Sequence, residues 1–127
     1  MKIFITSKGR ELDSKVDPRF GRAEYYIIYD TETAEFRAEE NPFKKGQTAV
    51  GISLAQRVIE EGAQVAISGN FGPNAFEVLK AAEIRLFRAG GEMKVKEAVD
   101  AFLRGELPEM DSATPREVAD RLEKELK

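Results

Sequence analysis

The chain has 127 residues, a length typical of a single domain that encloses one hydrophobic core without help from disulfides. Its 20 Lys and Arg and its 23 Asp and Glu give a formal net charge of -3 and are interspersed along the chain, which argues against tight binding of nucleic acid. The sequence contains no Cys and no His, which excludes a disulfide framework and removes the side chains most used to hold zinc, copper or iron-sulfur centres.

Residues 2–6 are predicted to form a central strand, because Ile3, Phe4 and Ile5 would be apolar on both faces of a sheet. Polar residues follow this strand directly, where a signal peptide would continue its apolar core. No apolar run in the chain is long enough to span a bilayer. We therefore expect a cytoplasmic protein with no membrane partner. The charged fraction of 34% also resembles that of thermophile proteins.

A long loop and a hairpin are predicted next. Residues 7–22 show no sustained period and contain Gly9 and Gly21, and ordered loops of this length are more often functional than idle. Residues 24–30 are rich in aromatic and β-branched side chains, and residues 34–40 alternate between apolar and charged ones. These two segments are predicted to be antiparallel strands joined by a short turn.

Helices and strands alternate in the second half of the chain, as judged from apolar residues at helical spacing and from short buried runs. The predicted elements are a helix at 50–59, a strand at 64–68, a helix at 75–82, a strand at 84–87 and a helix at 95–103. Such alternation favours parallel pairing, because a right-handed crossover needs the intervening helix. We therefore predict an α/β fold with a mixed five-stranded sheet, an antiparallel meander plus two parallel strands, and helices on both faces.

The domain is predicted to cover residues 1–107 and to be followed by a linker at 108–113. Thr114, Pro115 and Glu117 then combine an N-cap hydroxyl, Pro at the first helical position and Glu at the third. A C-terminal helix at residues 114–127 is therefore expected. Its apolar stripe is narrow, so the helix could pack on the domain, join a dimer, or fray.

The first candidate site lies at the end of the long loop. Arg19 and Arg22 flank Phe20 and Gly21 just before a strand, and this group could hold an anionic or planar ligand. Arginine offers bidentate donors and a stacking plane, and Gly allows close approach of the backbone. In the alternative interpretation the two arginines pair with local carboxylates, Phe20 fills the sheet edge and Gly21 only makes a turn.

The second candidate is the turn between the strand at 64–68 and the helix that follows. The backbone N–H groups and the helix dipole at such a turn favour negative charge, and open α/β sheets bind ligands at that edge. The turn lacks the spacing of the common phosphate loops, so a tight connection that needs glycines is an equally good interpretation. Its candidate residues are Gly69, Asn70, Gly72, Pro73 and Asn74.

A third turn, with Gly90 and Gly91, would lie beside the second and could line the same crevice, although a plain turn is the simpler interpretation. Catalytic groups are scarce, since a serine such as Ser68 has no His to activate it and the predicted central strands carry no carboxylates for magnesium. We therefore expect a protein that is not an enzyme.

The order of these motifs resembles the nitrogenase iron-molybdenum cofactor biosynthesis (accessory factor) family, from residue 1 to about residue 107. The motifs that carry the resemblance are DPRFGRA at 17–23, GNFGPNA at 69–75, EAV at 97–99 with Phe102, and GEL at 105–107. The resemblance implies a ribonuclease-H-like fold that carries iron-molybdenum cofactor or its iron-sulfur precursor. It also implies that the loops holding Arg19 to Arg22 and Gly69 to Asn74 face the ligand. Family members are expected to offer a His or Cys ligand to the cluster, which this chain lacks.

Two main hypotheses about function follow, and an enzyme that performs hydrolysis or phosphotransfer with a borrowed magnesium ion is the third. The leading one is a non-catalytic carrier that binds a metallocluster, a cofactor precursor or another small anion through Arg19, Arg22 and backbone amides. The alternative is a protein–protein interaction module that docks a partner through the same surface or through the C-terminal helix, with no small molecule involved.

Overall fold

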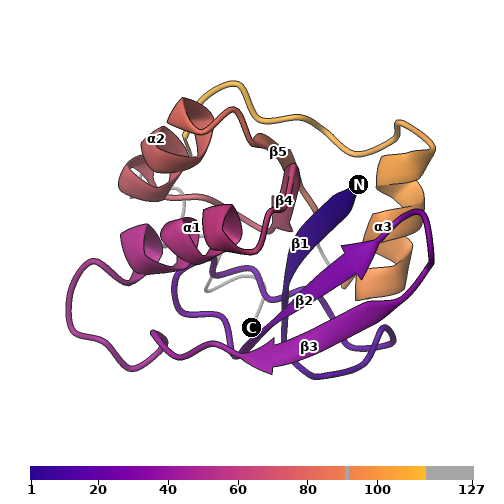
Figure 1. Cartoon of the computed structure of the whole chain (residues 1–127), viewed down its shortest axis with the longest axis horizontal. Helices are drawn as coiled ribbons and strands as arrows, with labels where there is room; N and C mark the ends of the chain where they lie inside the picture. Colours follow the sequence, from indigo (N-terminus) through magenta and orange to yellow (C-terminus); the bar gives the residue numbers. More distant parts are fainter. Residues whose placement is uncertain (91, 114–127) are drawn as a thin grey trace.

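The computed structural model describes residues 1–90 and 92–113, so Gly91 and the predicted helix at 114–127 lie outside the described residues. The chain forms a single mixed sheet with helices packed on it (Figure 1). The elements in chain order are β1 (Lys2–Ser7), β2 (Tyr25–Asp30), β3 (Phe36–Glu40), α1 (Val50–Glu60), β4 (Val65–Ser68), α2 (Pro73–Ala81), β5 (Arg85–Arg88) and α3 (Val95–Leu103).

The five strands lie in the order β3-β2-β1-β4-β5. Strand β1 pairs antiparallel with β2 and parallel with β4, so that Phe4 lies opposite both Ile28 and Ala66. Strands β2 and β3 are antiparallel, and β4 and β5 are parallel. The predicted antiparallel meander with two parallel additions is confirmed, and β1 is the central strand that its apolar run indicated.

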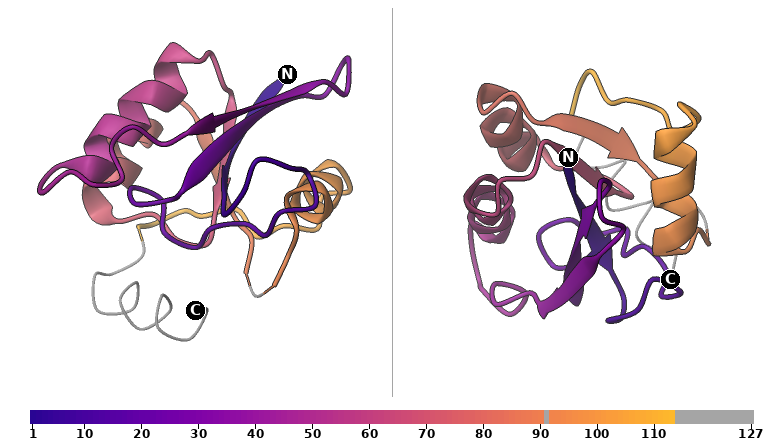
Figure 2. Two further views of the ribbon diagram at one scale, coloured as in Figure 1. Left: turned by 90° about the horizontal axis from the view of Figure 1, so that it is seen from below. Right: turned by 45° about the vertical axis from the view of Figure 1, so that its right-hand side comes forward.

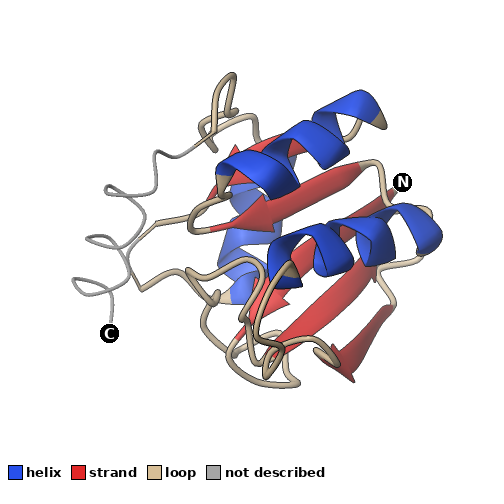
Figure 3. Ribbon diagram, turned by 90° about the vertical axis from the view of Figure 1, so that its left-hand side faces the viewer, coloured by secondary structure: helices blue, strands red, loops and turns tan. Residues whose placement is uncertain are grey.

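Helices α1 and α2 lie side by side on one face of the sheet, and α3 covers the other (Figures 2 and 3). The alternation along β1 divides the core accordingly. Phe4 packs with Leu54 and Leu79 under α1 and α2, whereas Ile3 and Ile5 pack in the cluster that α3 covers. None of the helices in the described ranges is long and apolar enough to cross a membrane.

The ends of the helices follow local rules. Gly62, just after α1, and Gly105, just after α3, have φ angles of 74° and 73°, the left-handed conformation that terminates helices at little cost when the residue is Gly. Helix α2 begins at Pro73, whose missing N–H costs nothing in the first turn. The glycine turn predicted at 69–74 is therefore partly helical.

The segment predicted as a linker runs along the outer edge of β5. Glu109 pairs with Phe87 in an antiparallel bridge, and the N–H of Met110 donates to the carbonyl oxygen of Leu86 at 2.8 Å. Met110 also packs against the core cluster beneath α1 and α2. Residues 108–110 thus satisfy backbone groups that would otherwise form an open sheet edge.

Candidate functional site

The loop between β1 and β2 is organised around the carboxylate of Asp17, which is fully buried. Its Oδ1 accepts hydrogen bonds from the backbone N–H of Arg19 (3.0 Å) and from Arg19 Nε (3.1 Å). Its Oδ2 accepts from Arg19 Nη2 and from the backbone N–H of Glu24, both at 3.1 Å. A bidentate pair of this kind fixes the guanidinium plane. Asp17 therefore sets both the path of the loop and the orientation of Arg19.

Asn41 holds the other end of this loop. Its side chain is buried, and Nδ2 donates to the carbonyl oxygens of Gly21 (3.0 Å) and Ala23 (2.9 Å). Its Oδ1 accepts from the backbone N–H of Phe43 at 3.0 Å. One amide thus joins the arginine-bearing loop to the segment that leads into α1.

The turn after β4 meets this loop at the same edge of the sheet. Asn70 and Arg19 form an isolated parallel bridge, and Asn70 Nδ2 donates to the carbonyl oxygen of Pro18 at 2.5 Å. At Gly69 the two backbones are so close that a Cβ would lie 2.5 Å from the Cα of Pro18. The two segments that the sequence singled out, about fifty residues apart, are therefore in direct contact.

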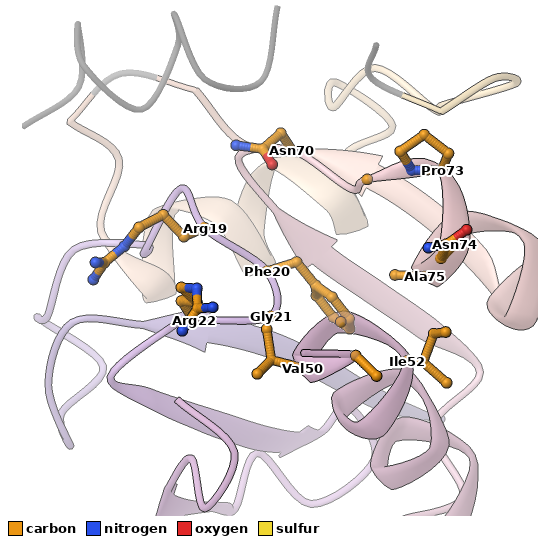
Figure 4. Close-up of a pocket in the computed structure, with 13 residues that line it drawn as sticks. Arg19, Phe20, Gly21, Arg22, Val50, Ile52, Asn70, Pro73, Asn74 and Ala75 are labelled. Atoms are coloured by element: carbon orange, nitrogen blue, oxygen red, sulfur yellow. The ribbon is translucent and has the colours of Figure 1, made fainter. Parts of the chain in front are cut away.

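A cavity of about 460 Å³ opens at this junction, between the arginine-bearing loop and the starts of α1 and α2 (Figure 4). Its lining consists of Arg19, Phe20, Gly21, Arg22, Ala49, Val50, Gly51, Ile52, Asn70, Gly72, Pro73, Asn74 and Ala75. The volume falls within the range of small-molecule sites in proteins.

The cavity has a cationic side and an apolar side. Figure 4 shows Arg19 and Arg22 together on one side, and Ile52, Pro73 and Ala75 on the other. Phe20 lies between them, and its ring is 5.0 Å from that of Phe71 in the core. Phe20 is only 3% exposed, so it forms the floor of the cavity and is not available to stack on a ligand.

Two helix N-termini contribute further positive potential. Neither α1 nor α2 has a side chain that caps its first turn, and neither carries an acidic residue there. The first N–H groups of a helix have no partner within the helix and form the positive end of its dipole. Because Val50, Gly51 and Ile52 of α1 and Asn74 and Ala75 of α2 line the cavity, both helix starts border it.

The two arginines differ in how their charge is balanced. Arg19 pairs with Asp17 and lies 3.9 Å from Glu24, as the alternative interpretation anticipated. Arg22 instead donates from Nη1 to the carbonyl oxygens of Lys44 (3.1 Å) and Gly46 (2.9 Å). Within residues 1–90 and 92–113, no carboxylate forms a salt bridge with Arg22, so no ion pair among these residues offsets its charge at the cavity.

Lys44 is engaged outside the cavity. Its ammonium donates to Glu40 and Glu24, each at 3.0 Å, and these hydrogen bonds raise the pKa of Lys44. The same contact lowers the pKa of Glu40. The lysine therefore braces the segment before α1 and does not supply charge to the cavity.

Most of the residues predicted to face a ligand lie together. Gly69 does not line the cavity but allows the close approach of the two segments, and Gly90 lies elsewhere on the surface. Sequence reasoning missed the wall made by residues 49–52. A signal was present, because a helix that crosses over before a parallel strand begins at the edge where that strand ends.

The described residues around the cavity can bind a ligand through hydrogen bonds and charge. Among them, no group of three or more His, Cys, Asp or Glu side chains is placed to hold a metal ion. The cavity itself is lined by donors and apolar groups, with no Asp or Glu among the described residues that form it. Such a lining suits an anion that keeps its own ligands and is held by hydrogen bonds and charge, without coordination by the protein.

Comparison with known proteins gives a consistent picture. The protein family described as dinitrogenase iron-molybdenum cofactor matches residues 1–105, which include every residue of the cavity. An uncharacterised protein of Methanocaldococcus jannaschii is 28% identical over 102 residues, covering 78% of this chain and 86% of that protein.

Two solved structures share the fold and much of the sequence. The apo form of the orange protein from Desulfovibrio gigas superposes with a TM-score of 0.85 at 34% identity, covering 89% of this chain and 95% of that one. A NifB-like protein from Thermotoga superposes with a TM-score of 0.78 at 40% identity, covering 91% and 97% of the two chains.

Proposed function

Because the chain belongs to the dinitrogenase iron-molybdenum cofactor family, we propose that it is a non-catalytic cytoplasmic carrier whose cavity holds an anionic metallocluster or cofactor precursor. Family membership and the likeness to the orange protein support a cofactor-binding or carrier role in general terms. More specifically, we propose that the cargo binds in the cavity and is recognised by its negative charge.

The observation that carries the proposal is the convergence of unlike sources of positive potential on one cavity. Arg22 contributes a guanidinium that no carboxylate among the described residues neutralises, and the starts of α1 and α2 contribute N–H groups that have no partner within their own helices. Hydrogen bonds from charged donors to an anion are worth roughly 1.5–3 kcal/mol each. Ile52 on the opposite wall and Val50 beside Gly21 add apolar contact that suits a large, weakly hydrated anion.

The donor set also limits how a cluster would be held. The chain has neither Cys nor His, so it offers no thiolate or imidazole to coordinate iron or molybdenum. We therefore propose that the cargo keeps all of its own ligands and is retained by hydrogen bonds to its outer atoms. Retention of this kind is reversible, as a carrier requires.

The proposal is tested by equilibrium binding of tetrathiomolybdate, a soluble metal–sulfur anion, to the full chain. We expect Arg22→Ala to weaken binding about tenfold or more, because it removes a charged donor from the cavity. Arg104→Ala is the matched control, since Arg104 is an exposed arginine that pairs with Glu106 beyond α3. Equal affinity in all three proteins, or no affinity in any, would contradict the proposal.

The alternative, a protein–protein interaction module, is distinguished by removing residues 114–127. A cavity formed within residues 19–75 retains its ligand after this deletion. If the deletion abolishes association with a partner or with a second copy, and the cavity binds no anion, the interaction role takes precedence.

A further inference from the structure

Arg22 contacts two parts of the molecule at once. Its side chain lines the cavity, and its Nη1 donates to the carbonyl oxygens of Lys44 and Gly46. A guanidinium carries five N–H donors, and in the described part of the chain these two hydrogen bonds use Nη1 alone. Nε and Nη2 can therefore donate to an anion in the cavity while Nη1 holds the backbone of residues 44–46.

Residues 43–49, the rim loop, are attached mainly at their ends. Asn41 fixes the start through the N–H of Phe43, and helix α1 fixes the end. From residue 45 to residue 49 every side chain is exposed. Phe43 and Lys44 are the exceptions within the loop, since Phe43 packs against the core cluster beneath α1 and α2 and Lys44 pairs with Glu24 and Glu40. In the described part of the chain, the two hydrogen bonds from Arg22 hold the backbone in the middle of the rim loop to the arginine-bearing loop, and Gly46 also lies against the side chain of Val50.

The last residue of the rim loop is held in a disfavoured conformation. Ala49 has a φ of 57°, in the left-handed region that residues with a Cβ rarely adopt, and it forms part of the cavity wall. Because this conformation is disfavoured for Ala49, contacts elsewhere must hold the rim loop in its observed path. Arg22 supplies such contacts, and any change in its position acts on the cavity wall itself.

We propose that Arg22 couples occupancy of the cavity to closure of the rim loop, so that a bound anion tightens the loop and an empty cavity leaves it easier to open. This inference rests on the proposed function, because it needs an anion in the cavity. The anion on Nε and Nη2 restricts the guanidinium, and the restricted guanidinium holds the carbonyl oxygens of Lys44 and Gly46 more firmly. Coupling through one shared side chain is reciprocal, so closing the loop also strengthens retention of the anion.

Limited trypsin digestion reports on the loop directly, because Lys45 is exposed at its centre. The rate of cleavage after Lys45 is followed by mass spectrometry, with cleavage after Arg104 as the internal reference. In wild type we expect saturating tetrathiomolybdate to slow cleavage after Lys45 by about fivefold or more, a typical size for coupling between two sites, and to leave the reference unchanged. Hydrogen exchange of the amides of residues 43–49 is measured in parallel and is expected to slow likewise.

Arg22→Lys separates the coupling from the charge. The lysine keeps a positive group at the cavity but cannot donate to two carbonyl oxygens and an anion in fixed directions. We expect faster cleavage of the ligand-free variant after Lys45 and no protection by the probe, even at concentrations that saturate it. Circular dichroism establishes that the variant is folded.

The outcomes distinguish the two proposals. If wild type binds the probe and the cleavage and exchange rates of the rim loop do not change, the coupling is wrong and the carrier role stands. If wild type does not bind the probe, the carrier role and the coupling fall together. Equal rates of cleavage after Lys45 in ligand-free wild type and ligand-free Arg22→Lys would also contradict the proposal that Arg22 holds the rim loop.

Discussion

Asp17 places a charged group where no water reaches it, and the structure compensates fully for that burial. Its two oxygens accept four hydrogen bonds, three of them from Arg19 and one from the backbone of Glu24. Thr6 adds a hydrogen bond of 2.7 Å from its hydroxyl to the carbonyl oxygen of Asp17. The carboxylate of Asp17 organises the loop and also balances the charge of Arg19. Asp17 therefore orients Arg19 but weakens the attraction of Arg19 for an anion.

We expect Asp17→Asn to lower the free energy of unfolding by about 2–4 kcal/mol, because it breaks a buried ion pair and replaces one accepting oxygen by an NH2 group, which turns a donor toward the N–H donors of Arg19 and Glu24. Urea unfolding at neutral pH measures this. The matched control is Asp13→Asn, because the carboxylate of Asp13 pairs with Lys96 at the surface and its loss should have a much smaller effect on stability. Similar values for the two variants would show that the buried pair does not organise the loop.

At the level of elements, the edge of the sheet is built by close backbone contact between the loop after β1 and the turn after β4. Gly69 lies against Pro18, and Gly21 lies against the first turn of α1, where a Cβ would meet the backbone nitrogen of Gly51 at 2.8 Å. In both places the neighbour is main chain, which cannot rotate away as a flexible side chain would. Absence of a Cβ at residues 21 and 69 is therefore a condition for forming the cavity.

Gly69→Ala should destabilise the protein by roughly 2 kcal/mol or more, because the added methyl group would overlap the backbone of Pro18. It should also weaken anion binding by separating the two walls. Gly90→Ala is the control, since a Cβ there meets nothing within 4 Å. Thermal unfolding of both variants, each compared with wild type, gives the result. A Gly69→Ala protein as stable as Gly90→Ala would mean that the contact relaxes freely.

The elements themselves were largely predictable from the sequence. The strand predicted at 2–6 is Lys2–Ser7, and the helix predicted at 95–103 is Val95–Leu103, because each pattern of apolar residues is long and regular. Strand β3 begins two residues later than predicted, since Ala34 adopts a φ of 60° and belongs to the turn. The loops that hold Arg19 and Asn70 were expected to face the same ligand, and the direct contact between these two residues is seen only in the structure. The wall at 49–52 and the bond from Arg22 to the loop were not predicted, because they depend on tertiary contacts that leave no periodic signal.

For the molecule as a whole, Glu61 connects the helix layer to the sheet. It follows α1, accepts a hydrogen bond from Tyr26 in β2 at 3.1 Å, and pairs with Arg37 in β3 at 2.6 Å. Burial on its own would raise the pKa of Glu61, but the hydrogen bond and charge of Arg37 hold it below its ordinary value of 4.5. Lowered pKa values of this kind make part of the folding energy depend on pH.

The lowered pKa of Glu61 determines how its contribution to stability changes with pH. The contribution of Glu61 is fully present above its unfolded pKa and is lost as pH falls through the lower folded value. We expect Glu61→Gln to lower the free energy of unfolding by about 1–2 kcal/mol near pH 7, and by clearly less near pH 3.5. Glu60→Gln, at an exposed neighbour that among the described residues pairs only with Arg57, should show little difference at either pH. Urea titrations at the two pH values decide, and a pH-independent loss for Glu61→Gln would contradict this sign.

The walls of the cavity come from stretches of chain at 19–22, 49–52 and 70–75, none of which forms the compartment by itself. A nascent chain therefore cannot bind a ligand in this cavity until residue 75 has been synthesised and the sheet has formed. Under the proposed carrier role, loading would be confined to the folded protein, and a fragment that lacks one of these stretches would release its ligand.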